Sequence, residues 1–212
     1  MTSEGIKPIF FTSDWHVGEE TSMRFDNRPF SSLEHMHECL INNFNKLVPE
    51  DGLTYFLGDM GYSKDGILAN ILSALNGTKV LILGNHDRGS NNGYCNGFDV
   101  VLNEAVIYIC NQKVSLTHCP LRGILREDCS KMRGHIPGDL WHGESRHLKF
   151  SREAHSGFHL HGHIHSPNKG QSKKILDHQY DVGLPANHYK PVSHRTIESW
   201  ITKCLVERNK LK

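Results

Sequence analysis

The sequence lacks the features that mark several broad classes of protein. Across 212 residues, 24 Lys and Arg balance 23 Asp and Glu, which leaves a formal net charge of +1. Nonspecific binding to nucleic acid requires a basic surplus, so this balance argues against it. No apolar run approaches the roughly 18 residues of a membrane span, and we expect no membrane association. The N-terminus also lacks the pattern of a secretory signal, so a cytoplasmic location is expected.

Cysteine pairs and domain boundaries are missing as well. The six cysteines form no Cys-x-x-Cys pair and no zinc-ribbon spacing, so we interpret them as reduced thiols. No repeat, low-complexity tract or linker divides the chain. We therefore expect a single domain over residues 1–212. Within it, residues 121–157 have little periodicity and many charges, and they are predicted to form a long loop or a cap over the site.

Histidine, by contrast, is abundant. The chain contains 16 histidines, and none of them stand next to one another, which excludes a purification tag. Histidine is the commonest metal ligand in proteins and a common acid–base group near neutral pH. The distribution of these residues along the chain is therefore the first guide to function.

Strand-like and helix-like segments alternate through the first half of the chain. Short apolar runs predict buried strands at 6–12, 53–57 and 80–83. Between them, apolar residues at helical spacing predict helices at 33–47, opened by a Ser31–Glu34 capping box, and at 67–75. This alternation is typical of βαβ units and parallel pairing in an α/β fold. The second half is predicted to contain strands at 100–102, 105–110, 113–117, 158–161 and 174–182, and a C-terminal helix.

Residues of metal-ligand type follow five of these strands. They are, in chain order, Asp14 and His16, Asp59, Asn85-His86-Asp87, His118, and His163 with His165. In open α/β sheets the ligand site lies beyond the carboxyl ends of the strands. Because residues i and i+2 of an extended segment face the same side, Asp14 and His16 can reach one ion together, as can His163 and His165. The sequence therefore predicts that these side chains meet at one metal site.

The types of ligand restrict the metal. Carboxylates, an amide oxygen and imidazoles suit Mn, Fe, Zn, Co or Ni better than Mg or Ca, which prefer oxygen alone. Two divalent ions need a bridging ligand, and the Asp59 carboxylate is the natural candidate. Such a pair can clamp both the attacking and the leaving oxygen of a phosphoryl transfer. We expect two divalent transition-metal ions, with manganese the expected metal in vitro.

The ordered set resembles the calcineurin-like metallophosphoesterase superfamily. The pattern Asp-x-His, Gly-Asp, Gly-Asn-His-Asp, His and Gly-His-x-His runs from Asp14 to His165. The segments Asn27-Arg28-Pro29-Phe30 and His118-Cys119-Pro120-Leu121 also look like a small bacterial and phage subgroup of these enzymes. The resemblance implies a two-sheet β-sandwich flanked by helices, in four αββα layers. It also implies hydrolysis of a phosphomonoester or phosphodiester by a hydroxide that bridges the two metals.

The resemblance also implies a role for each residue. Asp14, His16, Asp59 and His165 would hold the first metal, and Asp59, Asn85, His118 and His163 the second. His86 would protonate the leaving oxygen or stabilise the charge on phosphorus, and Asp87 would orient His86. Arg28 and Arg88 lie close in sequence to these motifs, and either can contact a substrate phosphate or form a surface ion pair. After Gly58-Asp59 the chain continues as Met60-Gly61-Tyr62 rather than Asp-Arg-Gly, which lowers the expectation of a phosphoprotein substrate.

We therefore expect a small phosphorylated substrate, such as a nucleotide or a nucleic-acid end, and no obligate protein partner. Two other functions remain open from the sequence. One is a catalytically inactive metal-binding scaffold of the same fold, and the other is a metal-dependent nucleic-acid-binding module. Hydrolysis by metal-loaded protein separates the enzyme from the scaffold, and salt-dependent binding without cleavage would indicate the nucleic-acid module.

Overall fold

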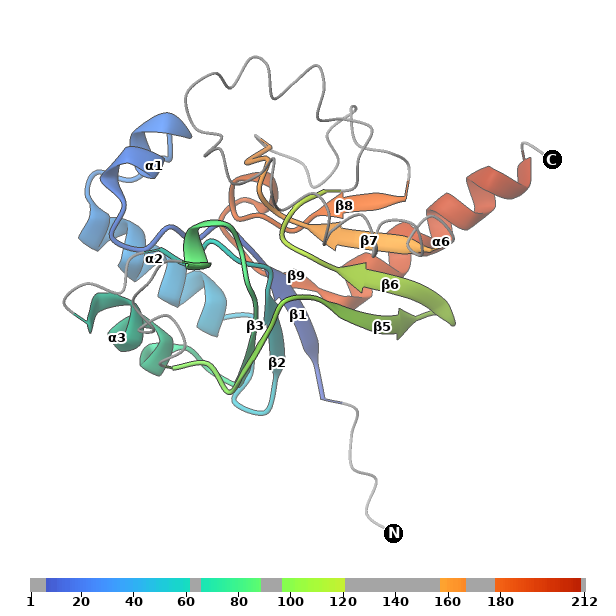
Figure 1. The fold of residues 1–212 in the computed structure, drawn as a ribbon, viewed down its shortest axis with the longest axis horizontal. Coiled ribbons are helices and arrows are strands. Elements are labelled where there is room, and N and C mark those ends of the chain that lie inside the picture. The colour runs from blue at the N-terminus through green and yellow to red at the C-terminus, as the bar shows by residue number, and fades with distance from the viewer. Residues whose placement is uncertain (1–6, 62–65, 89–96, 121–156, 167–177, 211–212) are drawn as a thin grey trace, which may run out of the picture.

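A computed structural model describes residues 7–61, 66–88, 97–120, 157–166 and 178–210 of the chain. The expected cap at 121–157 lies outside the described residues except for Gly157. In the described part, two β-sheets lie against each other with helices around them (Figure 1). The α/β class and the two-sheet architecture expected above are therefore confirmed.

The first sheet has five strands and contains the predicted parallel units. Its order is β4-β3-β2-β1-β9, where β4 is Val100–Leu102, β3 Thr78–Ile82, β2 Leu53–Phe56, β1 Ile9–Thr12 and β9 Val192–Ser193. Strands β1 to β4 pair in parallel, and β9 pairs antiparallel with β1. The two-residue strand β9 was not predicted, since so short a segment has no periodicity. The parallel strands direct their carboxyl ends to one edge of the sheet.

The second sheet has four strands in the order β5-β6-β7-β8. These are β5 Ala105–Ile109, β6 Gln112–Leu116, β7 Phe158–His161 and β8 Gln179–Asp181. Strand β5 pairs antiparallel with β6, while β6, β7 and β8 are parallel. The apolar side chains of both sheets form one core, in which Phe11 and Ile82 of the first sheet meet Val114 and Leu160 of the second. Helix α6 (His194–Lys210) adds Trp200, Ile201 and other side chains to this core.

Helices α2 (Leu33–Asn45) and α3 (Ile67–Ala74) lie on the first sheet (Figure 1). They pack their apolar faces into a second core, around Phe44 and Phe56. The N-cap of α2 is Ser32, whose side chain accepts a hydrogen bond from the His35 backbone N–H, so the predicted cap at Ser31 is wrong by one residue. Helix α1 (Glu20–Phe25) was not predicted, because six residues with no buried side chain give no apolar period.

No helix in the described ranges is long and apolar enough to cross a bilayer.

The second sheet carries polar side chains that are fully buried. His159 of β7 bonds the Thr117 hydroxyl through Nε2, at 2.8 Å, and Gln179 Oε1 through Nδ1, at 2.9 Å. Burial, together with the neighbouring His161, lowers the pKa of His159 from 6.5 to about 3. Burial likewise lowers the pKa of His161 to about 4. Both imidazoles are therefore neutral at pH 7, and both lie on the strand without reaching the ligand positions described below.

We expect the protein, in the presence of a chelator, to lose stability as the pH falls below 6.5. The unfolded chain binds a proton at His159 in this range, whereas the folded chain does not until about pH 3, so acid favours unfolding. One such histidine contributes a slope of up to about 1.4 kcal/mol per pH unit. Urea unfolding at pH 6.5, 5.5 and 4.5 measures the slope in wild type and in His159→Gln.

The comparison of slopes isolates His159 from other titrating groups. Burial and the nearby Asp14 charge raise the pKa of Asp181 from 3.8 to about 7. Between these two pH values Asp181 makes the folded protein more stable as the pH falls, which is opposite to the effect of His159. Asp181 is present in both proteins, and its contribution cancels in the difference. Equal slopes in wild type and His159→Gln would contradict the prediction.

Candidate metal centre

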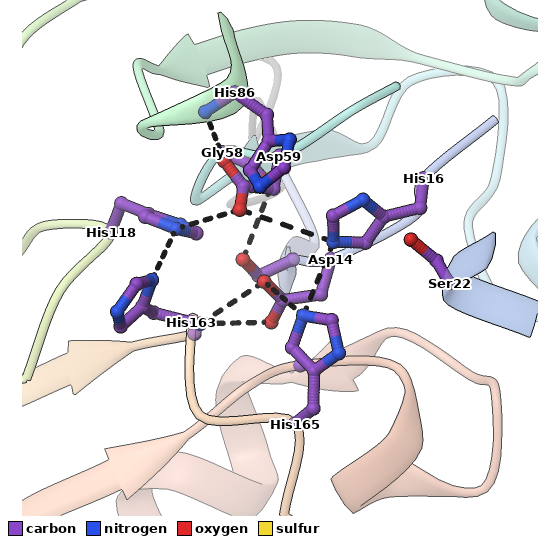
Figure 2. Close-up of polar contacts among 12 residues, drawn as sticks. Asp14, His16, Ser22, Gly58, Asp59, His86, His118, His163 and His165 are labelled. Atoms are coloured by element: carbon purple, nitrogen blue, oxygen red, sulfur yellow. Dashed lines mark hydrogen bonds and ion pairs between the residues drawn. The ribbon is translucent and has the colours of Figure 1, made fainter. Parts of the chain in front are cut away.

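The predicted strand-end residues meet at one place, at the carboxyl ends of β1, β2, β3, β6 and β7 (Figure 2). Five of them have a positive φ, in the left-handed region that L-residues rarely adopt: Asp14 at 61°, His16 at 50°, Asp59 at 55°, His163 at 72° and His165 at 46°. Each such residue costs about 1–2 kcal/mol, and strain of this kind persists where a site requires it. The chain therefore turns sharply at the end of three strands to direct ligand atoms inward.

Two groups of ligand atoms result. In the first position, formed by Asp14, His16, Asp59 and His165, the His16 and His165 Nε2 atoms lie 3.2 Å apart. His165 Nε2 lies 3.5 Å from Asp14 Oδ1, and His16 Nε2 lies 3.9 Å from Asp59 Oδ2. These residues come from three segments that are far apart in the sequence.

The second position is formed by Asp59, Asn85, His118 and His163. His118 Nε2 lies 3.1 Å from Asp59 Oδ2 and 2.9 Å from Asn85 Oδ1. His163 Nδ1 lies 3.0 Å from the same amide oxygen and 3.2 Å from His118 Nε2. Asp59 Oδ2 is thus close to the imidazoles of both positions, as expected of a bridging ligand.

These distances fit divalent metal ions. Two ligand atoms bound at about 2.1 Å to one ion lie about 3.0–3.4 Å apart in octahedral or tetrahedral geometry. Most of the separations above are near this range, including the 3.2 Å between the two imidazole nitrogens at each position. Overlapping trios drawn from these residues, such as Asp14–His16–His165 and Asp14–Asp59–His118, have all ligand atoms within 4.8 Å of one another. The nitrogen and oxygen donors suit a transition metal.

The charges at the centre are those of a site built for cations. Burial and the nearby His118 lower the pKa of His163 to about 3, so its imidazole is neutral and available as a ligand. Burial lowers the pKa of His165, but the charges and hydrogen bonds of Asp14 and Asp26 together outweigh it and raise the pKa to about 10. Burial opposes ionisation of Asp14 and Asp59 too, yet the imidazoles around them hold both pKa values well below the ordinary range. Cation binding would therefore release the proton held by His165.

Three groups behind the imidazoles were not predicted from the sequence. His16 Nδ1 donates to Glu19 Oε2 at 2.9 Å, and His165 Nδ1 donates to the Asp26 carboxylate at 2.8 Å. His118 Nδ1 donates to the Leu57 carbonyl at 2.7 Å. Such bonds fix the tautomer of a ligating histidine. The His16–Glu19 spacing of three residues was a usable signal, whereas Asp26 and His165 are 139 residues apart and gave none.

The structure gives Asp87 a different role from the one implied by the resemblance. Its carboxylate accepts hydrogen bonds from the backbone N–H groups of Asp59, Met60 and Gly84, at 2.8, 3.0 and 2.7 Å. Within the described residues it makes no hydrogen bond to the His86 imidazole. Asp87 therefore fastens the turn after β2 to the turn after β3, and it supports His86 only through the backbone.

The two candidate substrate arginines also differ from expectation. The Arg28 side chain is fully buried, and it donates to the carbonyl oxygens of Asp14 and Trp15 and to the Asp26 carboxylate. Its guanidinium is therefore not free to bind a substrate phosphate, and this part of the prediction is wrong. The Arg88 side chain lies outside the described residues.

His86 stands beside the first position. Its backbone N–H donates to Asp59 Oδ1 at 2.9 Å, and its ring meets the His16 ring edge-to-face with centroids 5.2 Å apart (Figure 2). The ring is partly exposed, unlike the buried His16 and His118. His86 can therefore face a substrate bound at the centre while its backbone stays tied to the bridging carboxylate.

We expect Asp87→Ala to destabilise the fold by about 3 kcal/mol or more, because it strands three buried N–H donors at roughly 1–3 kcal/mol each. Urea unfolding measures the loss. Asp51→Ala, which removes an exposed carboxylate from a turn, is the matched control and should change stability by less than about 0.5 kcal/mol. A variant as stable as wild type would restore the role implied by the resemblance, in which Asp87 serves His86 alone.

Comparison with known proteins supports the fold. No family model matches the chain. The uncharacterized protein MJ1445 of Methanocaldococcus jannaschii is 39% identical over 85 residues, which cover 39% of this chain and 48% of that protein. The chain thus matches about half the length of this relative.

Among solved structures, the protein of unknown function AQ665 from Aquifex aeolicus aligns over 92% of this chain and 99% of its own, with a TM-score of 0.67 and 23% identity. Yfce, a phosphoesterase from E. coli, aligns over 84% of this chain and 79% of its own, with a TM-score of 0.37 and 15% identity. This chain therefore shares the fold of AQ665, with two mixed sheets and flanking helices, and it carries the candidate ligand residues in the expected order at the strand ends.

Proposed function

We propose that this protein hydrolyses phosphoric esters with two divalent transition-metal ions, one at each of the two positions. The observation that carries the proposal is the shared Asp59 Oδ2, 3.9 Å from His16 Nε2 and 3.1 Å from His118 Nε2. When bound, two such cations polarise the phosphoryl oxygens and acidify the attacking water.

The residues of the chain would do the rest. Asp59 holds the two positions next to each other, and its Oδ1 also anchors the His86 backbone. The His86 imidazole, partly exposed beside the first position, would hold the proton that the leaving oxygen takes up. Asp87 keeps the Asp59 and His86 turns together through its three backbone contacts. No covalent intermediate on the protein is required.

The test is hydrolysis of p-nitrophenyl phosphate and bis(p-nitrophenyl) phosphate by protein depleted with a chelator and reloaded with Mn²⁺. We expect turnover only after reloading, and the ratio of the two rates assigns the enzyme as a monoesterase or a diesterase. His165→Ala, which removes a ligand of the first position, is the control for contaminating phosphatase. Protein that binds two ions but turns over neither ester would be the metal-binding scaffold instead.

The substrate class proposed from the sequence is a small nucleotide-like phosphoester. A screen of nucleotides, cyclic nucleotides and nucleic acids with phosphorylated ends tests it with the same Mn²⁺-loaded protein. Preference for a sugar phosphate or another non-nucleotide ester would overturn this part of the proposal and leave the reaction class standing.

A further inference from the structure

The segment from Glu19 to Arg28, which contains α1, contacts the residues of the first metal position and not those of the second. Three of its side chains, Glu19, Asp26 and Arg28, are buried although all three carry charge. Two of them bind imidazoles of the first position, and the third binds both Asp26 and the backbone of Asp14. Helix α1, which has no buried side chain, thus lies between Glu19 and Asp26, the two carboxylates that bind these imidazoles.

Asp26 and Arg28 connect two ligands that are 151 positions apart in the sequence, Asp14 and His165. The Asp26 carboxylate accepts from His165 Nδ1 at 2.8 Å and from Arg28 Nε at 3.0 Å. Arg28 Nη2 in turn donates to the Asp14 carbonyl at 2.9 Å, and Nη1 donates to the Trp15 carbonyl at 2.9 Å. The hydrogen bonds thus run without a break from His165 through Asp26 and Arg28 to Asp14. They are largely shielded from water, since the Asp26 side chain is only 4% exposed.

Glu19 supports the other imidazole of the same position. Its Oε2 accepts from His16 Nδ1 and from the Ser22 hydroxyl, both at 2.9 Å. Asp26 accepts from His165 Nδ1 in the same way, so each imidazole of the first position has a carboxylate behind it.

Among the described residues, no second carboxylate stands behind the imidazoles of the second position, where the Cys119 sulfur lies within 4.8 Å of ligand atoms of His118 and His163. His118 Nδ1 donates to a neutral carbonyl, that of Leu57, and Asn85 contributes an uncharged amide oxygen. In the described part of the chain, the only carboxylate that contacts its imidazoles is the shared Asp59. The two positions therefore share one carboxylate, but the first has three more, namely Asp14, Glu19 and Asp26.

We propose that Glu19 and Asp26 are positioning residues that make the first position the tighter of the two cation positions. A carboxylate that accepts from the distal ring nitrogen fixes the orientation of a ligating imidazole and makes the ligating nitrogen more basic. The carboxylate also places negative charge close to the ion, with only the imidazole ring between them. The inference rests on the proposed function only in taking both positions to bind divalent cations.

The experiment measures Mn²⁺ binding and not turnover. Full-length protein is stripped with a chelator and titrated with Mn²⁺ alone, by calorimetry and by electron paramagnetic resonance of the free ion. Wild type should bind two ions with dissociation constants at least tenfold apart. Asn85→Ala, which disables the second position, should retain the tighter ion, and His165→Ala should retain only the weaker one.

The positioning residues are then tested in the Asn85→Ala background. We expect Asp26→Asn and Glu19→Gln, which preserve shape and remove charge, each to weaken Mn²⁺ binding about 10–100-fold. Glu20→Gln is the matched control, because Glu20 is adjacent to Glu19 but 62% exposed, and it pairs with Arg24 on the surface. The visible spectrum of bound Co²⁺ should change in the first two variants and not in the control.

Several results would overturn the inference. The first is equal Mn²⁺ affinity at the two positions in wild type, and the second is unchanged Mn²⁺ affinity in a folded Asp26→Asn or Glu19→Gln variant. The third is that these two changes weaken Mn²⁺ binding as much in the His165→Ala background, where only the second position remains, as in the Asn85→Ala background. If Asp26→Asn does not fold, as judged by circular dichroism, Glu19→Gln decides the matter. Two unequal Mn²⁺ sites without ester hydrolysis would contradict the proposed function and leave this inference intact. Ester hydrolysis by a protein with two equal Mn²⁺ sites would contradict this inference and leave the proposed function intact.

Discussion

Replacing His86 with alanine should leave Mn²⁺ binding nearly unchanged and lower turnover of p-nitrophenyl phosphate about 10²–10⁴-fold, the range typical of a lost general acid. The backbone N–H of residue 86 still donates to Asp59 Oδ1, so the bridging carboxylate stays in place. The ring contacts His16 only edge-to-face, so its removal takes no ligand from either position. Metal content after desalting and kcat, measured on the same preparation, check both halves of the prediction.

The leaving group provides a sharper form of the same test. If His86 gives a proton to the leaving oxygen, its loss should slow phenyl phosphate more than p-nitrophenyl phosphate, because phenolate is the stronger base and needs the proton more. His35→Ala, which removes an exposed imidazole from α2, should change neither rate. Equal losses on both esters would remove proton donation from the role of His86, and full activity would remove the residue from the mechanism.

The sequence predicted which side chains meet at the candidate centre because their signal is local. Each of them follows an apolar strand, and parallel strands end at one edge of their sheet, so the side chains were expected to meet. The βαβ alternation that places them there was also readable, since β1, β2 and β3 are short apolar runs separated by helices with an apolar face. Local patterns that repeat along the chain are thus sufficient for the parallel strands of the first sheet, although not for β9, and for the set of candidate ligands that meet there.

What the sequence did not reveal depends on contacts between distant segments. The Asp26–His165 bond joins residues that no period or motif connects, and Asp26 lies in a stretch without apolar residues at regular spacing. The burial of Arg28 follows from the two carbonyl oxygens that it meets, and backbone acceptors leave no trace in the sequence. The sequence assigned Asp87 to its neighbour His86. In the structure its carboxylate instead accepts hydrogen bonds from three backbone N–H groups that belong to two different turns.

Replacing Asp59 with asparagine should have the largest effect of any single change at the centre. Asn retains an oxygen and the approximate shape, but it removes the negative charge that both positions share. We expect metal content after desalting to fall from two ions to one or fewer, and turnover to fall by at least about 10³-fold, because the cation pair supplies several kcal/mol of charge stabilisation. Elemental analysis and kcat measure the two effects.

Asp181→Asn distinguishes ligation from mere proximity. Asp181 is a buried carboxylate whose charge acts on Asp14, but it accepts hydrogen bonds from the Gly183 and Ser166 backbones and belongs to neither position. Its pKa of about 7 means that it is already protonated in part at neutral pH, so the neutral amide should leave metal content at two ions and turnover within about tenfold. If Asp181→Asn and Asp59→Asn lost metal equally, the centre would depend on total negative charge and not on a shared oxygen. The bridge is therefore tested by the difference between these two variants, one of which removes the charge of the shared carboxylate and the other only a nearby charge.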